Sequence, residues 1–303
     1  MSILDKIESL QNLLKQDSEN TQARRQLAVL LMDGGFNEEA LSHLLYLSRI
    51  FNNDDGIFYN LGIVYEKMKK FEKAKNAYLK SLDINPESVD AMYNLGLVYT
   101  ELKEFDRAIE CFQVILDYDK DDSNTYFSLG LAYFKNKDYI KAMENFQHTI
   151  DINDEDLYAH FYMGNIFKDL GDLDSARENF NKVLEISPDY SWAYYNLAVI
   201  DYEENNLDSA VNNLKKTVQM NPADFEAYKI LAKIELKRNN FEGALSAAET
   251  ALSKCEPNGD LYYLAAFVYK NIGDDENCQK YVKEASKNYR TLSIPIRALK
   301  QLM

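Results

Sequence analysis

Apolar and small residues recur along the chain at an interval of 34 residues. The segment "NLGIVY" begins at Asn60, "NLGLVY" at Asn94 and "SLGLAY" at Ser128. Frames of 34 residues that start at Thr21 repeat eight times without insertion and end at Leu292. In each frame, register positions 4, 7, 8 and 11 share one helical face at about 100° per residue, and positions 17, 20, 24 and 27 share another. Each frame therefore predicts two amphipathic helices that pack on one another.

Small residues stand at the predicted contact between the two helices of each frame. Register position 8 is glycine or alanine in every frame, and position 20 is alanine in seven of the eight. Position 15, between the helices, is glycine or asparagine in five frames, and these residues tolerate the left-handed conformation that ends a helix. Pro86, Pro188 and Pro222 stand at position 32, where the next helix has not yet begun.

This pattern resembles the tetratricopeptide repeat, which has an aromatic residue at position 4, Leu-Gly at 7 and 8, Tyr at 11, Ala at 20, an aromatic at 24 and Pro at 32. Asp201 and Glu235 depart from it at position 11, and Cys278 departs at position 20. The resemblance covers Thr21–Leu292. It implies an all-α fold, a right-handed superhelical solenoid of helix-turn-helix repeats.

The same register divides the chain into repeats and two flanking segments. Residues 1–20 and 293–303 each carry apolar residues on one helical face, so we expect an N-terminal and a C-terminal capping helix there. Between them, we expect eight repeats at residues 21–54, 55–88, 89–122, 123–156, 157–190, 191–224, 225–258 and 259–292.

Composition narrows the class of partner and the compartment. A net charge of −15 argues against nucleic acid, because phosphate binding needs a basic surface. The apolar runs are too short for a membrane helix, and the first residues lack the pattern of a signal peptide. Three widely separated cysteines fit a reducing compartment. We therefore expect an acidic, cytoplasmic protein that binds no nucleic acid and does not insert into membranes.

The sequence contains no convincing catalytic or metal-binding motif. Its three histidines fall in separate repeats, and neither C-x-x-C nor H-E-x-x-H occurs. An acidic run that begins at Asp151 has Asp156 and Tyr162 where a calcium loop needs glycine and glutamate. We therefore predict that the protein is not an enzyme and holds no cofactor or metal.

The first helix of each repeat carries a second apolar face, at register positions 2, 5, 9 and 12. Position 5 is aromatic in five consecutive frames, and position 9 is mostly aliphatic there. The resemblance implies that this face lines the concave surface on which family members bind peptides. Partial packing between repeats remains an alternative explanation. The predicted peptide-binding groove comprises Tyr59, Asn60, Ile63, Tyr93, Asn94, Leu97, Phe127, Leu131, Phe134, Tyr158, Phe161, Asn165, Trp192, Tyr195, Asn196, Val199, Tyr202, Lys229 and Lys233.

Lysines replace apolar residues on this face near the end of the array. Lys229, Lys233 and Lys237 occupy positions 5, 9 and 13 of the seventh frame, and Lys270 follows at position 12 of the eighth. They form a candidate anchor for a carboxylate, with solvated surface lysines as the alternative. The predicted partner is a protein or peptide that carries apolar or aromatic residues and, if the anchor is real, an acidic or C-terminal carboxylate group.

These observations favour a non-enzymatic protein–protein interaction scaffold that holds a peptide segment of a partner. Two alternatives stay open. Residues 279–303 carry a net charge of +5 and the remainder −20, so the ends of the array could dock on one another and give a homo-oligomer. The chain could also be an accessory or regulatory subunit of an enzyme.

Overall fold

The computed structural model describes residues 2–299, 301 and 302, and this part of the chain is helical throughout, without a strand. The chain divides into two compact units, Met1–Asp156 and Leu157–Met303. Unit 1 contains α1 (Ile3–Gln16), α2 (Thr21–Asp33), α3 (Asn37–Ile50), α4 (Asp55–Lys67), α5 (Phe71–Ile84), α6 (Val89–Glu101), α7 (Phe105–Tyr118), α8 (Ser123–Lys135) and α9 (Tyr139–Ile152).

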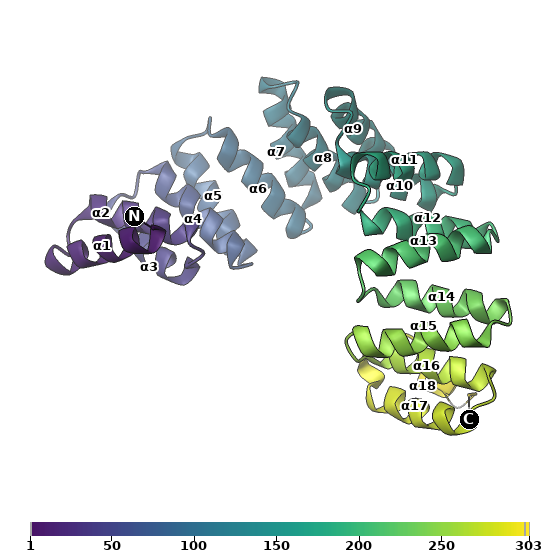
Figure 1. The fold of residues 1–303 in the computed structure, drawn as a ribbon. Coiled ribbons are helices and arrows are strands. Elements are labelled where there is room, and N and C mark those ends of the chain that lie inside the picture. The colour runs from purple at the N-terminus through teal and green to yellow at the C-terminus, as the bar shows by residue number, and fades with distance from the viewer. Residues whose placement is uncertain (1, 300, 303) are drawn as a thin grey trace. The chain divides into compact units, whose positions relative to one another are not determined.

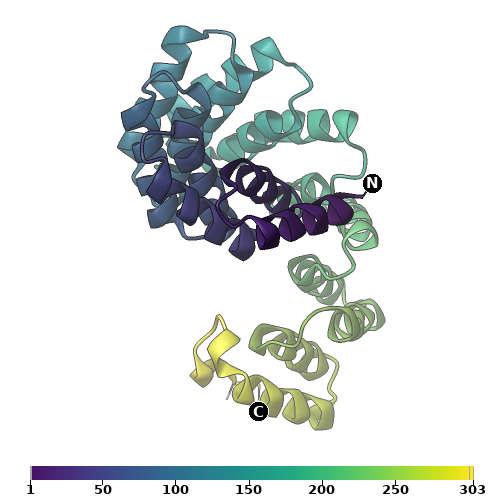
Figure 2. The ribbon, with the colours of Figure 1, turned by 90° about the vertical axis from the view of Figure 1, so that its left-hand side faces the viewer.

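Unit 2 contains α10 (Leu157–Leu170), α11 (Leu173–Ile186), α12 (Ser191–Glu203), α13 (Leu207–Met220), α14 (Phe225–Lys237), α15 (Phe241–Lys254), α16 (Gly259–Asn271), α17 (Asp275–Lys287), a 3-10 turn (Tyr289–Thr291) and α18 (Ile296–Leu299). Within each unit, helices that follow one another in the chain lie side by side (Figure 1, Figure 2). None of the helices in the described part of the chain is both long and apolar enough to cross a membrane.

Helix boundaries follow from capping residues at fixed register positions. The first helix of a repeat usually begins after an Asn, Asp or Ser whose side chain accepts a hydrogen bond from a backbone N–H in the first turn. Asp54 Oδ1, for example, accepts from Ile57 N at 3.2 Å, and Asp224 Oδ1 accepts from Ala227 N at 3.0 Å. The cap satisfies a donor that the helix cannot pair internally, so it fixes where the helix starts.

A left-handed residue ends the turn between the two helices of every repeat. Glycine and asparagine occupy this position in five repeats, with φ from 57° to 83°. Lys69, Lys103 and Lys137 adopt the same conformation, with φ of 56°, 62° and 63°. The turn is therefore kept even where the residue is not one that favours positive φ.

In the first six repeats, the side chains at register positions 8 and 24 match in size. A Cβ added at Gly96 would lie 2.7 Å from the Phe112 ring, and Gly62, Gly130 and Gly164 face aromatic rings at position 24 in the same way. Where position 24 is leucine, as in Leu44 and Leu214, position 8 is alanine. A glycine thus makes room for a ring and an alanine for a leucine, in keeping with close packing.

The two end segments differ from each other. Ser2 and Asp5 form a capping box that starts α1, with Asp5 N donating to Ser2 Oγ at 3.1 Å and Ser2 N to Asp5 Oδ2 at 2.7 Å. At the other end, the helix expected over 293–303 is limited to Ile296–Leu299. Leu299 and Leu302 are buried against α16 and α17, while Lys300 and Met303 lie outside the described residues.

Candidate functional site

The predicted groove residues of unit 1 are all half-buried. The aromatic rings at position 5 contact the buried ring at position 24 of their own repeats. The ring centroids of Tyr59 and Tyr78 are 5.9 Å apart. Tyr93 lies 5.7 Å from Phe112, and Phe127 repeats this arrangement on its own repeat's position 24 ring. The Tyr93 pair is edge-on and the other two pairs are tilted, and non-parallel contacts at these distances are favourable for aromatic rings. These rings therefore stabilise the repeats as well as presenting an edge to the surface.

Polar atoms of the same face join neighbouring repeats. Asn94 Nδ2 donates to the Tyr59 hydroxyl at 3.2 Å, and the hydroxyls of Tyr93 and Ser128 are hydrogen-bonded at 2.8 Å. Burial, followed by the nearby charge of Asp90, raises the pKa of the Tyr59 hydroxyl. These groups already have partners, so they contribute more to stacking of the repeats than to free binding capacity.

Aliphatic side chains supply the remaining apolar surface of unit 1. Ile63 packs on the core cluster of the first repeats, while Leu97 and Leu131 at the same register position are half-buried. Asn60 is also half-buried, and the Phe134 ring lies 5.8 Å from that of Tyr139. Ile63, Leu97 and Leu131 are thus apolar residues of this face that keep part of their surface exposed to a ligand.

Unit 2 presents larger exposed rings. Tyr158 is 57% and Trp192 is 52% exposed, although both contact neighbouring rings. The Trp192 ring lies edge-on to Tyr195 at 6.2 Å, and Tyr158 lies edge-on to Tyr190 at 6.5 Å. Burial is the main cause of the raised pKa of Tyr195. Half-exposed aromatic residues of this kind are enriched in protein interfaces.

An amide–lysine cluster lies in the middle of this face. Lys168 Nζ donates to Asn196 Oδ1 at 2.5 Å and to Asn165 Oδ1 at 3.5 Å. The amide nitrogens in turn donate to carbonyls one turn back, that of Asn165 to Phe161 O and that of Asn196 to Trp192 O, both at 2.9 Å. Burial lowers the pKa of Lys168. Lys168 was not among the predicted groove residues, although it stands at position 12 on the predicted face.

Two of the four candidate anchor lysines, Lys237 and Lys270, already contact polar side chains of the protein. Lys237 Nζ donates to Asn205 Oδ1 at 2.6 Å and lies 5.9 Å from the Tyr202 ring. Lys270 Nζ forms an ion pair with Asp275 at 3.0 Å. Each of these two lysines already has a partner, so a ligand carboxylate would share its ammonium group with that partner.

Lys229 and Lys233 line a hollow of about 250 Å³ within unit 2. Lys229 pairs with Glu226 on its own helix and lies 5.5 Å from the Phe225 ring. Lys233 is exposed and makes no ion pair or hydrogen bond with any residue that the structure describes. The hollow therefore holds one uncommitted ammonium group and one that is only paired at the surface, where such pairs are weak.

The other walls of this hollow are apolar and come from the last repeat and the segment that follows it. They are formed by Tyr263, Leu264, Phe267 and Ile294, with Asp260 and Ser293 at the edge. Asp260 Oδ1 accepts from Ser293 N at 2.7 Å and from Ser293 Oγ at 3.0 Å, which holds the segment against α16. Tyr263 and Phe267 occupy positions 5 and 9, so carrying the register one frame further would have found them. Nothing in the repeat pattern indicated Ile294.

Val199 is half-buried on α12. Among residues 2–299, 301 and 302, no group of three or more His, Cys, Asp or Glu side chains is placed to hold a metal ion. Burial raises the pKa of Cys111 to about 11 and also raises those of Cys255 and Cys278. The thiols are therefore protonated at neutral pH and poor nucleophiles.

Tetratricopeptide repeat models match residues 3–56, 57–88, 77–110, 123–156, 167–234 and 259–291. The chain belongs to the tetratricopeptide repeat family, as the sequence pattern predicted.

Solved structures agree on the fold. MamA from Desulfovibrio magneticus RS-1 is 26% identical with a TM-score of 0.54, over 57% of this chain and 97% of that one. The Cut9–Hcn1 hetero-tetramer of the APC/C matches with 16% identity and a TM-score of 0.58, over 86% and 52% of the two chains. PilW, a type IV pilus biogenesis factor, has the same identity and TM-score over 71% and 99%. No match was found among curated protein sequences.

Proposed function

We propose that this protein is a non-enzymatic interaction scaffold whose unit 2 binds a peptide segment of a partner protein. The observation that carries the proposal is the hollow at Lys229 and Lys233, where an uncommitted ammonium group stands against the apolar wall of Tyr263 and Phe267. Membership of a repeat family without an inserted catalytic domain supports a scaffold rather than an enzyme. The three unpaired cysteines support a place in the cytoplasm.

The chemistry of the hollow favours a ligand with an apolar or aromatic side chain next to a carboxylate. The ring and aliphatic walls suit the side chain, and the lysines suit the carboxylate as point charges. The protein as a whole carries a charge of −15, which repels acidic ligands from most of its surface. A carboxylate bound at the lysines therefore also sets the orientation of the peptide.

Further apolar contacts come from the exposed rings of the same unit. Trp192 and Tyr195 on α12 precede α14 and α16, which carry the hollow. We propose that upstream residues of the ligand contact these rings. The apolar side chains of unit 1, Leu97 and Leu131, offer a separate surface for the same or another segment.

Selection from random peptides tests the kind of ligand. A library displayed with free C-termini is selected on the full chain, and the dissociation constants of enriched peptides are measured. We expect enriched sequences with apolar or aromatic residues followed by an acidic or C-terminal carboxylate group. Amidating that carboxylate should weaken binding by about fivefold to tenfold, because one charge-assisted contact is lost. Enriched peptides that lack acidic residues and bind equally well when amidated would contradict the proposal.

A further inference from the structure

The first helix of the chain is in the register of a second helix. Extending the 34-residue frame backward from Thr21 puts Ile3 at position 17, where the second helices of all eight repeats begin, as α3 does at Asn37. α1 packs on α2 as α3 packs on α4. α1 is therefore the second half of a helix pair whose first half is not supplied by the described residues.

The surface that a first helix covers in other repeats is open on α1. Side chains at register positions 20, 24 and 27 are at most 5% exposed in all eight repeats. On α1 the same positions hold Lys6, which is exposed, Leu10, which is half-buried, and Leu13, which is 41% exposed. An apolar strip that is core everywhere else is thus solvent-accessible here.

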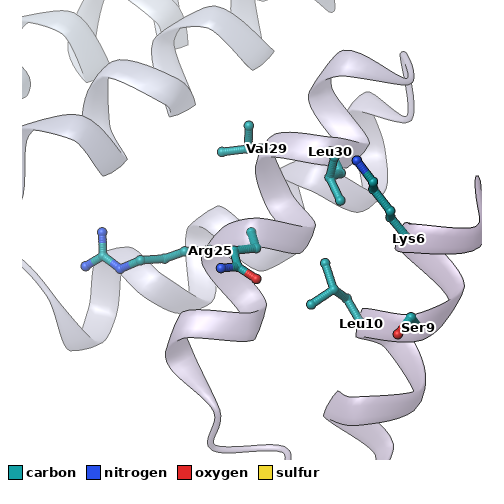
Figure 3. A pocket seen from close by; sticks show the side chains of 7 residues that line it. Lys6, Ser9, Leu10, Arg25, Val29 and Leu30 are labelled. Atoms are coloured by element: carbon teal, nitrogen blue, oxygen red, sulfur yellow. The ribbon is translucent and has the colours of Figure 1, made fainter. Parts of the chain in front are cut away.

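The neighbouring face of α2 is open in the same way. Register position 10 is at most 1% exposed in the seven later repeats, but Leu30 at this position of the first repeat is only half-buried. Leu30 lines a hollow of about 650 Å³ together with Lys6 and Leu10 (Figure 3). Elsewhere in the chain a first helix also contacts the next first helix, as α6 contacts α8 and α14 contacts α16. The hollow therefore lies where a preceding first helix would pack on both α1 and α2.

Leu10 limits the size of the side chain that a helix bound in this hollow can place opposite it. Position 24 packs against position 8, and leucine at 24 is matched by alanine at 8, as in Leu214 with Ala198. Leu10 stands at position 24, so a fitting helix carries alanine opposite it. A bulky residue there would meet Leu10 as a Cβ at Gly96 would meet Phe112.

Lys6 favours a negative charge on the residue of the bound helix that faces it. The two helices of a repeat are antiparallel, because position 24 packs on 8 while position 19 lies on 11, as in Arg107 over the Tyr99 ring at 5.7 Å. Lys6, at position 20, therefore faces a residue one turn beyond the alanine. The Lys6 amine has no hydrogen bond or ion pair within the described part of the chain, whereas Arg25 across the hollow already pairs with Asp54 at 2.7 Å. An aspartate or glutamate at the facing position complements Lys6.

We propose that α1 and α2 form a docking seat for an amphipathic helix of another protein, which completes the open helix pair with alanine against Leu10 and a carboxylate against Lys6. This seat is separate from the lysine hollow of unit 2 and does not depend on its function. Helix-in-groove binding of this kind depends on apolar anchors spaced along one helical face.

A helix from the chain itself provides a defined probe. The sequence 191–203 has alanine at position 8 and aspartate at position 11, in Ala198 and Asp201, and its natural partner at position 24 is a leucine. We would prepare it as an acetylated, amidated peptide with a side-chain bridge on its polar face, because an isolated helix of this length is marginal in water. Its binding to the full chain is measured by fluorescence anisotropy.

We expect saturable binding that weakens about tenfold with Lys6→Glu, because attraction to the peptide aspartate becomes repulsion. Lys15→Glu is the matched control, since it makes the same charge change on the exposed part of α1 and should leave affinity unchanged. Placing lysine at the peptide position of Asp201 should restore binding to the Lys6→Glu protein. Placing phenylalanine at the position of Ala198 should weaken binding by about tenfold or more.

Three results would overturn the proposal. The first is no saturable binding by the bridged peptide, and the second is an equal effect of Lys6→Glu and Lys15→Glu in proteins of unchanged helicity. The third is concentration-dependent self-association of the chain, seen by sedimentation and lost with Leu10→Asp. That result would mean that a second copy of this chain, and not a different protein, binds to α1 and α2.

Discussion

Single residues at the contact between paired helices decide how closely the helices of each repeat approach. The chain uses glycine against an aromatic ring in four repeats and alanine against leucine in two. The sequence showed that position 8 is small. It did not show which partner makes glycine necessary, because that depends on a ring sixteen residues away in the same repeat.

Replacing a glycine–aromatic pair by an alanine–leucine pair tests whether positions 8 and 24 must match in size. Gly96→Ala should lower the free energy of unfolding by about 1–3 kcal/mol, because the new methyl group overlaps the Phe112 ring. This loss exceeds the roughly 1 kcal/mol that alanine gains over glycine in a helix. Phe112→Leu alone should also destabilise, by leaving a cavity.

Combining the two changes recreates the alanine–leucine pair found elsewhere in the chain. The double variant should be more stable than the sum of the single effects by at least about 1 kcal/mol, in urea denaturation monitored by circular dichroism. Strictly additive losses would show that Gly96 and Phe112 do not restrict one another.

At the scale of elements, the capping residues and turns set where helices start and stop. First helices begin at the first position of every frame, and a left-handed residue follows their end in each repeat. Periodicity and turn chemistry predicted these boundaries because both depend on neighbouring residues alone. A capping helix was predicted over 293–303, but α18 spans only Ile296–Leu299. Its burial against α16 and α17 comes after a 3-10 turn at Tyr289–Thr291 that no repeat specifies.

The left-handed lysines provide an element-scale test. Lys103→Gly should raise the free energy of unfolding by about 0.5–1 kcal/mol, because glycine adopts φ of 62° without the strain of a side chain. Thermal unfolding followed by circular dichroism would show a higher midpoint. The matched control Lys120→Gly, in a turn without positive φ, should leave the midpoint unchanged or lower it. Equal effects of the two substitutions would mean that the conformation of Lys103 carries no strain.

At the scale of the whole molecule, the sequence predicted the repeat architecture, whereas the binding surface stays a prediction. Position 5 rings such as Tyr59 and Phe127 looked like ligand contacts, but they also pack on rings of their own repeats. Whether Lys233 or Lys237 is free depends on a partner one repeat away, here Asn205 for Lys237. Register fixes which face a residue lies on, while its availability depends on side chains of adjacent repeats.

Lys229 and Lys233 are proposed to hold the carboxylate of a peptide ligand. The dissociation constant of a selected peptide is therefore measured for the protein with Lys229→Glu and Lys233→Glu together. Lys215→Glu with Lys254→Glu is the control, because it makes the same charge change at exposed lysines outside the hollow.

At low salt, we expect the reversal at Lys229 and Lys233 to weaken binding by about tenfold or more, and the control to leave affinity nearly unchanged. The difference should shrink as salt screens the charges. An affinity that is the same for the unaltered protein and for the double reversal at low salt would contradict the account.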